Sequence, residues 1–479
     1  MSLARRTVTS ISWNVLANVI GAVISFARSI LLARWLPIEA FGVYTQAVSW
    51  VRLTVVFANF GMGAAFLHRA TETEDEQVAA SVHFTLKLIF VLVWGLALVV
   101  GAMTFAGGEL RMAILWLALA VGGAELAQTP QLLLTRRVVH RRLALFQLLN
   151  VLLITAVSLI LAWRGVALWA LLATDLATFG LTIFLFYIWR PVWKPRLVWS
   201  KQVIRYYLYF GSRSLLAESL LRALNRIDDL WTGSYLGDTA LGFYSRAYTF
   251  ATYPRQLLAS PINNVAGGTY AELKHDRRRL SQAFFSINAL MIRAGFLLAG
   301  ALALVAPEFI LLGLGERWMP MLNAFRLMLV FTLLDPMKVT IANLYVAVGR
   351  PELVVKVRII QVIVLVGGLF FLGNRWDITG VALAVDLMLV VGIAILLQQA
   401  KKFVDYKIVK LFLVPSLALV TALVVALGSS HLFDFSDLSW NTAVAKTIAF
   451  LTVYIGILLV GERQQMVQTI SFLRKIVGR

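Results

Sequence analysis

The chain has 479 residues, of which 60% are hydrophobic and only 14% are charged, and its mean hydropathy is +0.81. About a quarter of the residues of a soluble globular protein are charged, so this composition excludes a mainly soluble protein. Cysteine is absent, which excludes disulfides, iron–sulfur clusters and thiolate zinc sites. The five histidines are scattered, so we expect no metal site and no cofactor.

Long apolar blocks separated by short polar breaks recur along the whole chain. A membrane-spanning helix needs about 20 mainly apolar residues. We therefore expect an all-α integral membrane protein of about fourteen transmembrane helices. The expected spans are residues 10–33, 40–63, 80–105, 112–134, 143–162, 165–189, 205–231, 239–265, 284–306, 321–347, 353–373, 376–398, 409–428 and 441–461. The first span has no small-residue cleavage site after it, so we interpret it as a retained helix rather than a signal peptide.

The distribution of Lys and Arg predicts the orientation. With both termini in the cytoplasm of a bacterial inner-membrane protein, most cations fall in cytoplasmic segments, as the positive-inside rule requires. The cations left in the outer loops are Arg34, Arg111, Arg164, Arg317 and Arg375. The net charge of +20 thus reflects membrane topology, and we do not expect a nucleic-acid partner.

The chain contains an internal repeat. Residues 35–47, WLPIEAFGVYTQA, align without gaps to residues 235–247, YLGDTALGFYSRA. A second match, Gly165-Val-Ala-Leu168 with Gly380-Val-Ala-Leu383, opens the sixth helix of each half. Since six is even, both halves have the same orientation, an arrangement typical of transporters with a central site. We expect two pseudo-symmetric six-helix bundles, residues 1–190 and 191–400, and two further helices within residues 401–479.

Charged residues inside the predicted spans are candidate functional residues, because a charge in the bilayer is unfavourable unless it is paired or lines a cavity. The cations are Arg28, Arg52, Lys87, Arg213, Arg222, Arg226, Arg246, Arg255, Arg293, Arg326, Lys338 and Lys446. The acids are Glu125, Asp175, Glu218, Asp228, Asp229, Asp335 and Asp386. The excess of cations favours an anionic cargo, and Arg suits phosphate through bidentate hydrogen bonds. For Lys87, Arg213, Arg326 and Lys446, near span ends, snorkelling to the interface is the simpler interpretation.

The first and seventh spans each carry a polar face. Asn14, Asn18, Gly21, Ser25 and Arg28 recur at helical spacing in the first, where a seam between packed helices is the alternative interpretation. The second face is Ser214, Glu218, Arg222, Asn225 and Asp229. A helix this polar is unsuited to lipid, so we expect it to face protein or water. No nucleotide-binding or catalytic motif is present, and we do not expect an enzyme.

The repeated segments resemble those of bacterial polysaccharide transporters. Leu31-Leu-Ala-Arg-Trp-Leu-Pro-Ile-Glu-Ala-Phe-Gly-Val-Tyr44 is similar to their first-half signature. Gly237-Asp-Thr-Ala-Leu-Gly-Phe-Tyr-Ser-Arg-Ala247, with Pro254 and Pro261 after it, is similar to their second-half segment. These transporters form a branch of the multidrug/oligosaccharidyl-lipid/polysaccharide exporter superfamily. The resemblance implies a flippase that moves undecaprenyl-pyrophosphate-linked oligosaccharide units by alternating access, for exopolysaccharide or lipopolysaccharide assembly, and that an H⁺ or Na⁺ gradient is a possible driving force.

On this interpretation, the arginines bind the pyrophosphate or anionic sugars, and the acids couple to ions or pair with the arginines. The candidate substrate-binding residues are Arg28, Arg52, Arg222, Arg246, Arg255 and Arg293, and the ion-coupling candidates are Glu218, Asp228 and Asp335. One alternative is a multidrug or metabolite antiporter of the same fold, which the cation excess disfavours. Another is a membrane-bound glycosyltransferase, polymerase or ligase, which the short outer loops and missing catalytic motifs disfavour.

Overall fold

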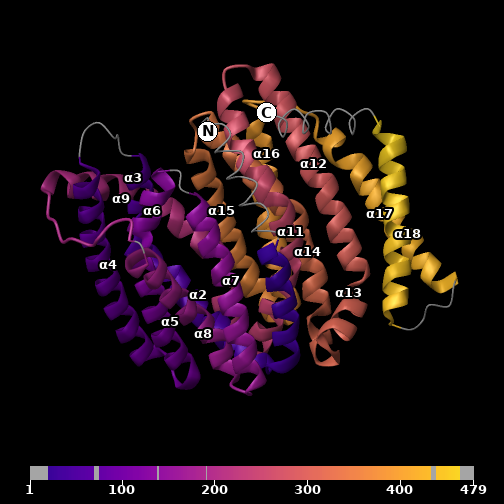
Figure 1. The fold of residues 1–479 in the computed structure, drawn as a ribbon. Helices are drawn as coiled ribbons and strands as arrows, with labels where there is room; N and C mark the ends of the chain where they lie inside the picture. The colour runs from indigo at the N-terminus through magenta and orange to yellow at the C-terminus, as the bar shows by residue number, and fades with distance from the viewer. Residues whose placement is uncertain (1–19, 69–74, 138–139, 190, 433–437, 464–479) are drawn as a thin grey trace. The chain divides into compact units, whose positions relative to one another are not determined.

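The computed structural model describes residues 20–68, 75–137, 140–189, 191–432 and 438–463 (Figure 1). Every regular element in these ranges is helical, which confirms the expected all-α fold. Residues 10–19 of the first expected span and both predicted cytoplasmic termini lie outside the described residues. The chain forms two compact units, Met1–Ser245 (unit 1) and Arg246–Arg479 (unit 2).

Unit 1 consists of the first half of the repeat and the start of the second. After a helix described over residues 20–35 come α2 (Ile38–Asn59), α3 (Met62–His68), α4 (Glu76–Phe105), α5 (Gly108–Leu126), α6 (Gln128–Arg136), α7 (His140–Trp163) and α8 (Ala167–Ile183). A π-helical turn, Phe184–Ile188, extends α8, and α9 (Lys201–Leu224) and α10 (Ile227–Tyr235) follow. Because α9 packs against α2, α3 and α4, the compact units do not coincide with the expected repeat halves, whose boundaries stay a prediction.

Unit 2 begins within α11 (Asp238–Leu273) and continues with α12 (Arg277–Leu304) and α13 (Ala306–Glu308). A π-helical turn (Phe309–Leu314) and a 3-10 turn (Glu316–Met321) lead into α14 (Leu322–Ala347). The remaining helices are α15 (Glu352–Gly368), its π-helical extension Leu369–Gly373, α16 (Asn374–Ala400), α17 (Ile408–Leu432) and α18 (Trp440–Gly461). The last two pack against each other and against α12 (Figure 1).

Within the described ranges, nine helices are long and apolar enough to cross a membrane, or ten if the bent pair α2 and α3 is one span. One of the nine, Glu352–Ala400, holds two expected spans, because the backbone leaves the helical region at Trp376 and Asp377 and α15 packs back against α16. The chain is therefore a multi-pass membrane protein. The total of fourteen spans stays a prediction.

Three of the expected spans are interrupted by residues outside the regular helices. The second bends by 45° between α2 and α3, at Phe60 and Gly61, which both have positive φ. The fourth is interrupted at the single residue Ala127, between α5 and α6, although Gly108–Arg136 still counts as one span. The prediction of one continuous seventh helix was also wrong: α9 ends at Leu224, and the backbone of Arg226 (φ −139°) is not helical. Consequently Asp229 lies on α10 and does not share the face of Ser214, Glu218 and Arg222.

The two copies of the repeated segment meet within unit 1 through equivalent glycines. A Cβ added to Gly42 would collide with the backbone carbonyl of Asp238, and one added to Gly242 would collide with the carbonyl of Ile38. Each glycine thus lies against the first turn of the other copy. The motif keeps glycine at both positions because only hydrogen leaves room for this approach.

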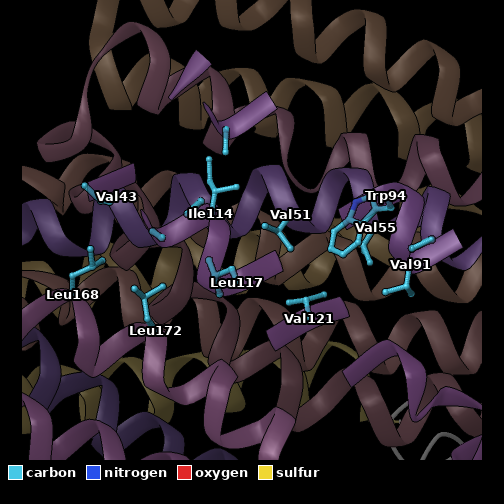
Figure 2. Close-up of a cluster of buried hydrophobic side chains, with 14 residues drawn as sticks. Val43, Val51, Val55, Val91, Trp94, Ile114, Leu117, Val121, Leu168 and Leu172 are labelled. Carbon is cyan, nitrogen blue, oxygen red and sulfur yellow. The ribbon is translucent and has the colours of Figure 1, made fainter. Parts of the chain in front are cut away.

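The apolar core of unit 1 fixes the rotation of α2. Val43, Val51 and Val55 of α2 pack with residues of α4, α5 and α8, including Trp94 and Leu117 (Figure 2). The Trp94 indole also donates a hydrogen bond to the Thr54 hydroxyl at 3.0 Å. Since neighbouring helical residues point about 100° apart, burial of Val51 leaves Arg52 exposed at the edge of the core.

Candidate functional site

Two of the predicted arginines of unit 1 lie near one carboxylate, and a third contacts the backbone beside it. The Arg52 guanidinium of α2 lies 3.6 Å from the Asp175 carboxylate of α8, which also accepts a hydrogen bond from the Tyr44 hydroxyl at 2.7 Å. Arg28 of the first helix lies within electrostatic range of Asp175. Arg222 of α9 donates to the backbone carbonyl of Arg52 at 3.2 Å. The structure thus brings together Arg28, Arg52 and Arg222, which are far apart in the sequence.

The side chain of Arg52 remains accessible. It is 44% exposed, and its ion pair with Asp175 is long for direct charge-assisted hydrogen bonds, which fall near 2.7–2.9 Å. The guanidinium therefore keeps donors that an anion can accept from. Two arginines and a tyrosine hydroxyl beside a single carboxylate give this part of unit 1 a net positive character.

Glu218 lies one helical turn before Arg222 on α9, and both lie within electrostatic range of Lys87 on α4. Among the described residues, the hydrogen bond of the Arg222 guanidinium goes to the Arg52 carbonyl and not to Glu218. Simple pairing of Glu218 with Arg222 is therefore not observed. The side chain of Glu218 is half-buried.

Two adjacent buried carboxylates occupy the first turn of α10. Asp228 accepts a hydrogen bond from the Tyr244 hydroxyl at 2.6 Å, while Asp229 accepts one from Ser49 at 2.9 Å and pairs with Arg226 at 3.2 Å. The Oδ1 atom of Asp228 has no hydrogen-bond partner among the described residues. In the same ranges, no three His, Asp or Glu side chains converge in a way that could hold a metal ion.

Asp335, the third ion-coupling candidate, is the centre of a cationic group in unit 2. Its carboxylate lies 2.6 Å from the Arg255 guanidinium of α11 and 2.5 Å from the Lys338 ammonium of α14. Both cations also lie over the Phe331 ring, at 5.2 and 5.5 Å from its centroid. One buried carboxylate thus shares two cations, and the group keeps a net charge of about +1.

Arg293 occupies a different environment from the other predicted arginines. Its guanidinium is buried on α12 and lies 2.5 Å from the carboxylate of Glu462, which follows α18. The Tyr454 hydroxyl of α18 donates to the Arg293 backbone carbonyl at 2.9 Å. This residue therefore attaches the C-terminal helices to α12. Arg246, the last of the six, is half-buried on α11.

Two lysines that we expected to snorkel are instead paired inside the protein. Lys87 is fully buried, and its ammonium contacts three polar side chains. Lys446 of α18 lies 2.7 Å from the buried carboxylate of Glu308. The snorkelling interpretation was wrong for both, because it considered only distance from the span end. The partners come from other helices, and sequence spacing does not show them.

The sequence profile of a family described as "Polysaccharide biosynthesis protein" matches residues 31–323, which is more than half of the chain. The chain belongs to this family. The family resemblance expected from the repeated segments is thereby confirmed.

Curated members of this kind include the succinoglycan biosynthesis transport protein ExoT of Rhizobium meliloti. It is 27% identical over 65% of this chain and 64% of its own length, so the match spans just under two thirds of that relative. The lipopolysaccharide biosynthesis protein WzxC of Escherichia coli is 23% identical over 82% of this chain and 80% of its own. The teichuronic acid biosynthesis protein TuaB of Bacillus subtilis is 21% identical over 74% and 73%.

Solved structures show the same fold. The lipid II flippase MurJ in an inward closed conformation superposes with a TM-score of 0.75 at 14% identity, covering 94% of this chain and 99% of MurJ. An inward-facing multidrug resistance transporter of the MATE family, from the MOP superfamily, gives a TM-score of 0.61 at 15% identity over 81% and 98%. The predicted membrane transporter fold is confirmed.

Proposed function

We propose that this chain is a flippase for lipid-linked oligosaccharides. It moves undecaprenyl-pyrophosphate-linked repeat units across the bacterial inner membrane by alternating access, and it is a transporter rather than an enzyme. Both termini lie in the cytoplasm. Family membership and the transport and lipopolysaccharide biosynthesis proteins among its relatives support this cargo class.

The observation that carries the proposal is the gathering of Arg28, Arg52 and Arg222 in unit 1. A pyrophosphate presents several oxygens in the geometry that arginine binds bidentately. A multidrug antiporter would need a site that attracts cations, and a group of three arginines repels them. In this proposal Arg246 of unit 2 is a further candidate for binding the anionic cargo, whereas the Arg255 guanidinium is already paired with Asp335 at 2.6 Å.

Coupling to an H⁺ or Na⁺ gradient is assigned to Asp228, Glu218 and Asp335, in that order. Asp228 is buried and its second oxygen is unpartnered among the described residues, so that oxygen is the candidate acceptor of a proton or ion. Glu218 lies in the electrostatic field of Lys87 and close in sequence to Arg222. Asp335 is engaged by two cations, which disfavours its release during a transport cycle.

The decisive experiment is reconstitution of the purified protein into liposomes that contain a labelled polyprenyl-pyrophosphate oligosaccharide. We expect the label to become accessible at the opposite leaflet, and expect Arg52→Ala to abolish most of this movement. The matched control is Arg137→Ala, which removes an exposed arginine whose partner is Glu76. If neither leaflet exchange nor binding of the lipid is detected, while a cationic drug is exported, the antiporter alternative replaces this proposal.

A further inference from the structure

A buried lysine that the flipping mechanism does not use joins α4 to three other helices of unit 1. The Lys87 side chain on α4 has no exposed surface. Its ammonium donates to the Glu125 carboxylate at 2.8 Å, to the Gln128 side-chain carbonyl at 2.9 Å and to the side-chain carbonyl of Asn59. An ammonium has three donors. Three side-chain oxygen atoms therefore match its three donors.

The three oxygens come from the ends of broken helices. Asn59 is the last residue of α2, directly before the left-handed backbone of Phe60 and Gly61. Glu125 and Gln128 stand on either side of the break at Ala127. The network also closes on itself, since the Asn59 amide donates to the other oxygen of Glu125 at 3.4 Å. The Lys87 ammonium thus links the interruption after α2 and the interruption between α5 and α6 to α4.

The three oxygen atoms around the Lys87 ammonium are ligands of the kind that bind a hard metal cation. One carboxylate and two amide carbonyls are oxygen ligands, which alkali and alkaline-earth ions prefer. The N···O distances of 2.8 and 2.9 Å match a large monovalent ion, and ammonium and K⁺ are similar in size. Mg²⁺ requires near-ideal octahedral geometry, which one carboxylate and two amide oxygens do not provide.

We propose that Lys87 is a built-in cation: its ammonium occupies a three-oxygen monovalent-cation site in unit 1 and fixes the breaks of α2/α3 and α5/α6 without a free ion. The aliphatic side chain of Lys87 tethers the ammonium to α4, so the site stays occupied at every ion concentration. When the tether is removed, the cage accepts K⁺ or a small alkylammonium ion. Lys87 is thus a positioning residue that acts through Asn59, Glu125 and Gln128.

The test is the cation dependence of thermal stability in purified Lys87→Ala. This substitution deletes three methylenes and the ammonium, which are the heavy atoms of n-propylammonium. In choline chloride we expect Lys87→Ala to have a lower Tm than the wild type. Adding KCl or n-propylammonium chloride should raise its Tm with concentration, because a ligand that binds only the folded state stabilises it. The wild type should not respond, and MgCl₂ should have little effect on the variant.

The chain offers a matched control in Lys446→Ala, which removes a largely buried lysine whose one ion-pair partner among the described residues is the Glu308 carboxylate, so it leaves no cage of three oxygens. Its Tm should not rise with K⁺ beyond the effect of choline. The double variant Lys87→Ala/Glu125→Gln keeps three oxygens but not the charge, and should lose the response to K⁺. No Tm shift in Lys87→Ala with either cation, or an equal shift in Lys446→Ala, would overturn the proposal.

If Lys87→Ala does not accumulate, its yield in cultures supplemented with n-propylammonium becomes the measurement. A higher yield supports the cage, and an unchanged yield contradicts it. All of these measurements concern stability and do not depend on the cargo. A failure of the flipping assay therefore leaves this inference standing, and its own failure leaves the proposed function untouched.

Discussion

The arginines at positions 52 and 293 both lie in predicted spans, yet their surroundings differ in a way that assigns them different roles. Arg52 is 44% exposed on its side chain and lies 3.6 Å from Asp175. Arg293 is 10% exposed and lies 2.5 Å from Glu462. A guanidinium held directly by a buried carboxylate has few donors left for a ligand, whereas a loosely paired one keeps them. A charged residue inside a predicted span is therefore a candidate for substrate binding, and the partner of its side chain indicates whether it binds substrate or stabilises the fold.

We expect the largest effect from a substitution that breaks the tighter of these two ion pairs, Arg293–Glu462. Arg293→Met leaves the Glu462 carboxylate buried and uncompensated, which lowers stability by about 3–5 kcal/mol. We expect a strongly reduced Tm in detergent and low accumulation in membranes. The double variant Arg293→Met/Glu462→Leu removes both charges and should recover most of the loss.

The same double variant sharpens the comparison with Arg52. If Arg293 is structural, the double variant should flip its substrate nearly as well as the wild type. A double variant that folds normally but does not transport would return Arg293 to the substrate-binding residues. Purification yield, Tm and flipping in liposomes together separate these outcomes.

For Arg52 we expect the opposite pattern, a loss of transport with little loss of stability. Arg52→Lys keeps the charge but removes the bidentate geometry. A hydrogen bond to a charged group contributes about 1.5–3 kcal/mol, so transport should fall roughly 10- to 100-fold. Arg137→Lys, at an exposed pair, is the control. A variant that transports normally, or that fails only because the protein is absent, would make Arg52 structural.

The sequence predicts those features that depend on local composition. Most of the expected spans correspond to observed helices, and the repeated segments meet through the glycines at 42 and 242. The break at Ala127 also has a local signal, since Pro130 fits the first turn of the helix that follows it. Gly61, with its positive φ, is the corresponding signal for the bend after α2.

The pairing of charges could not be predicted in the same way. Arg293 and Glu462 are 169 residues apart, and Lys87 meets Glu125 across 38 residues. Such contacts depend on how whole helices pack, and the spacing of residues along one helix does not show which partner a charged residue will meet. This is why Arg293 was grouped with the substrate-binding arginines and Lys87 was interpreted as a snorkelling residue.

We expect smaller effects from substitutions of the ion-coupling candidates. These substitutions test whether Asp228 and Asp335 have different roles, as their different partners indicate. Asp228→Asn should fold but lose most of the stimulation that an imposed H⁺ or Na⁺ gradient gives to flipping. Asp335→Asn should instead reduce Tm, because Arg255 and Lys338 lose a shared partner. Glu218→Gln is the third variant of the series. Normal gradient dependence in Asp228→Asn would remove that residue from the coupling mechanism.

The smallest effect concerns an exposed ion pair, which contrasts with the buried pair of Arg293. Arg277, at the start of α12, contacts Asp405 in the loop before α17 at 2.7 Å, and its hydrogen bonds hold the pKa of the Asp405 carboxyl below its usual range. A carboxyl whose pKa is lower in the folded state stabilises the protein above the unfolded-state pKa, near 3.9. That contribution is lost as the pH falls through the lower folded-state pKa.

We therefore expect Asp405→Asn to lower Tm slightly at pH 7, and the difference from the wild type to shrink below about pH 4. Salt should reduce the same difference, because exposed charges are screened. A Tm difference that persists in acid and in high salt would mean that Asp405 acts through packing rather than through its charge.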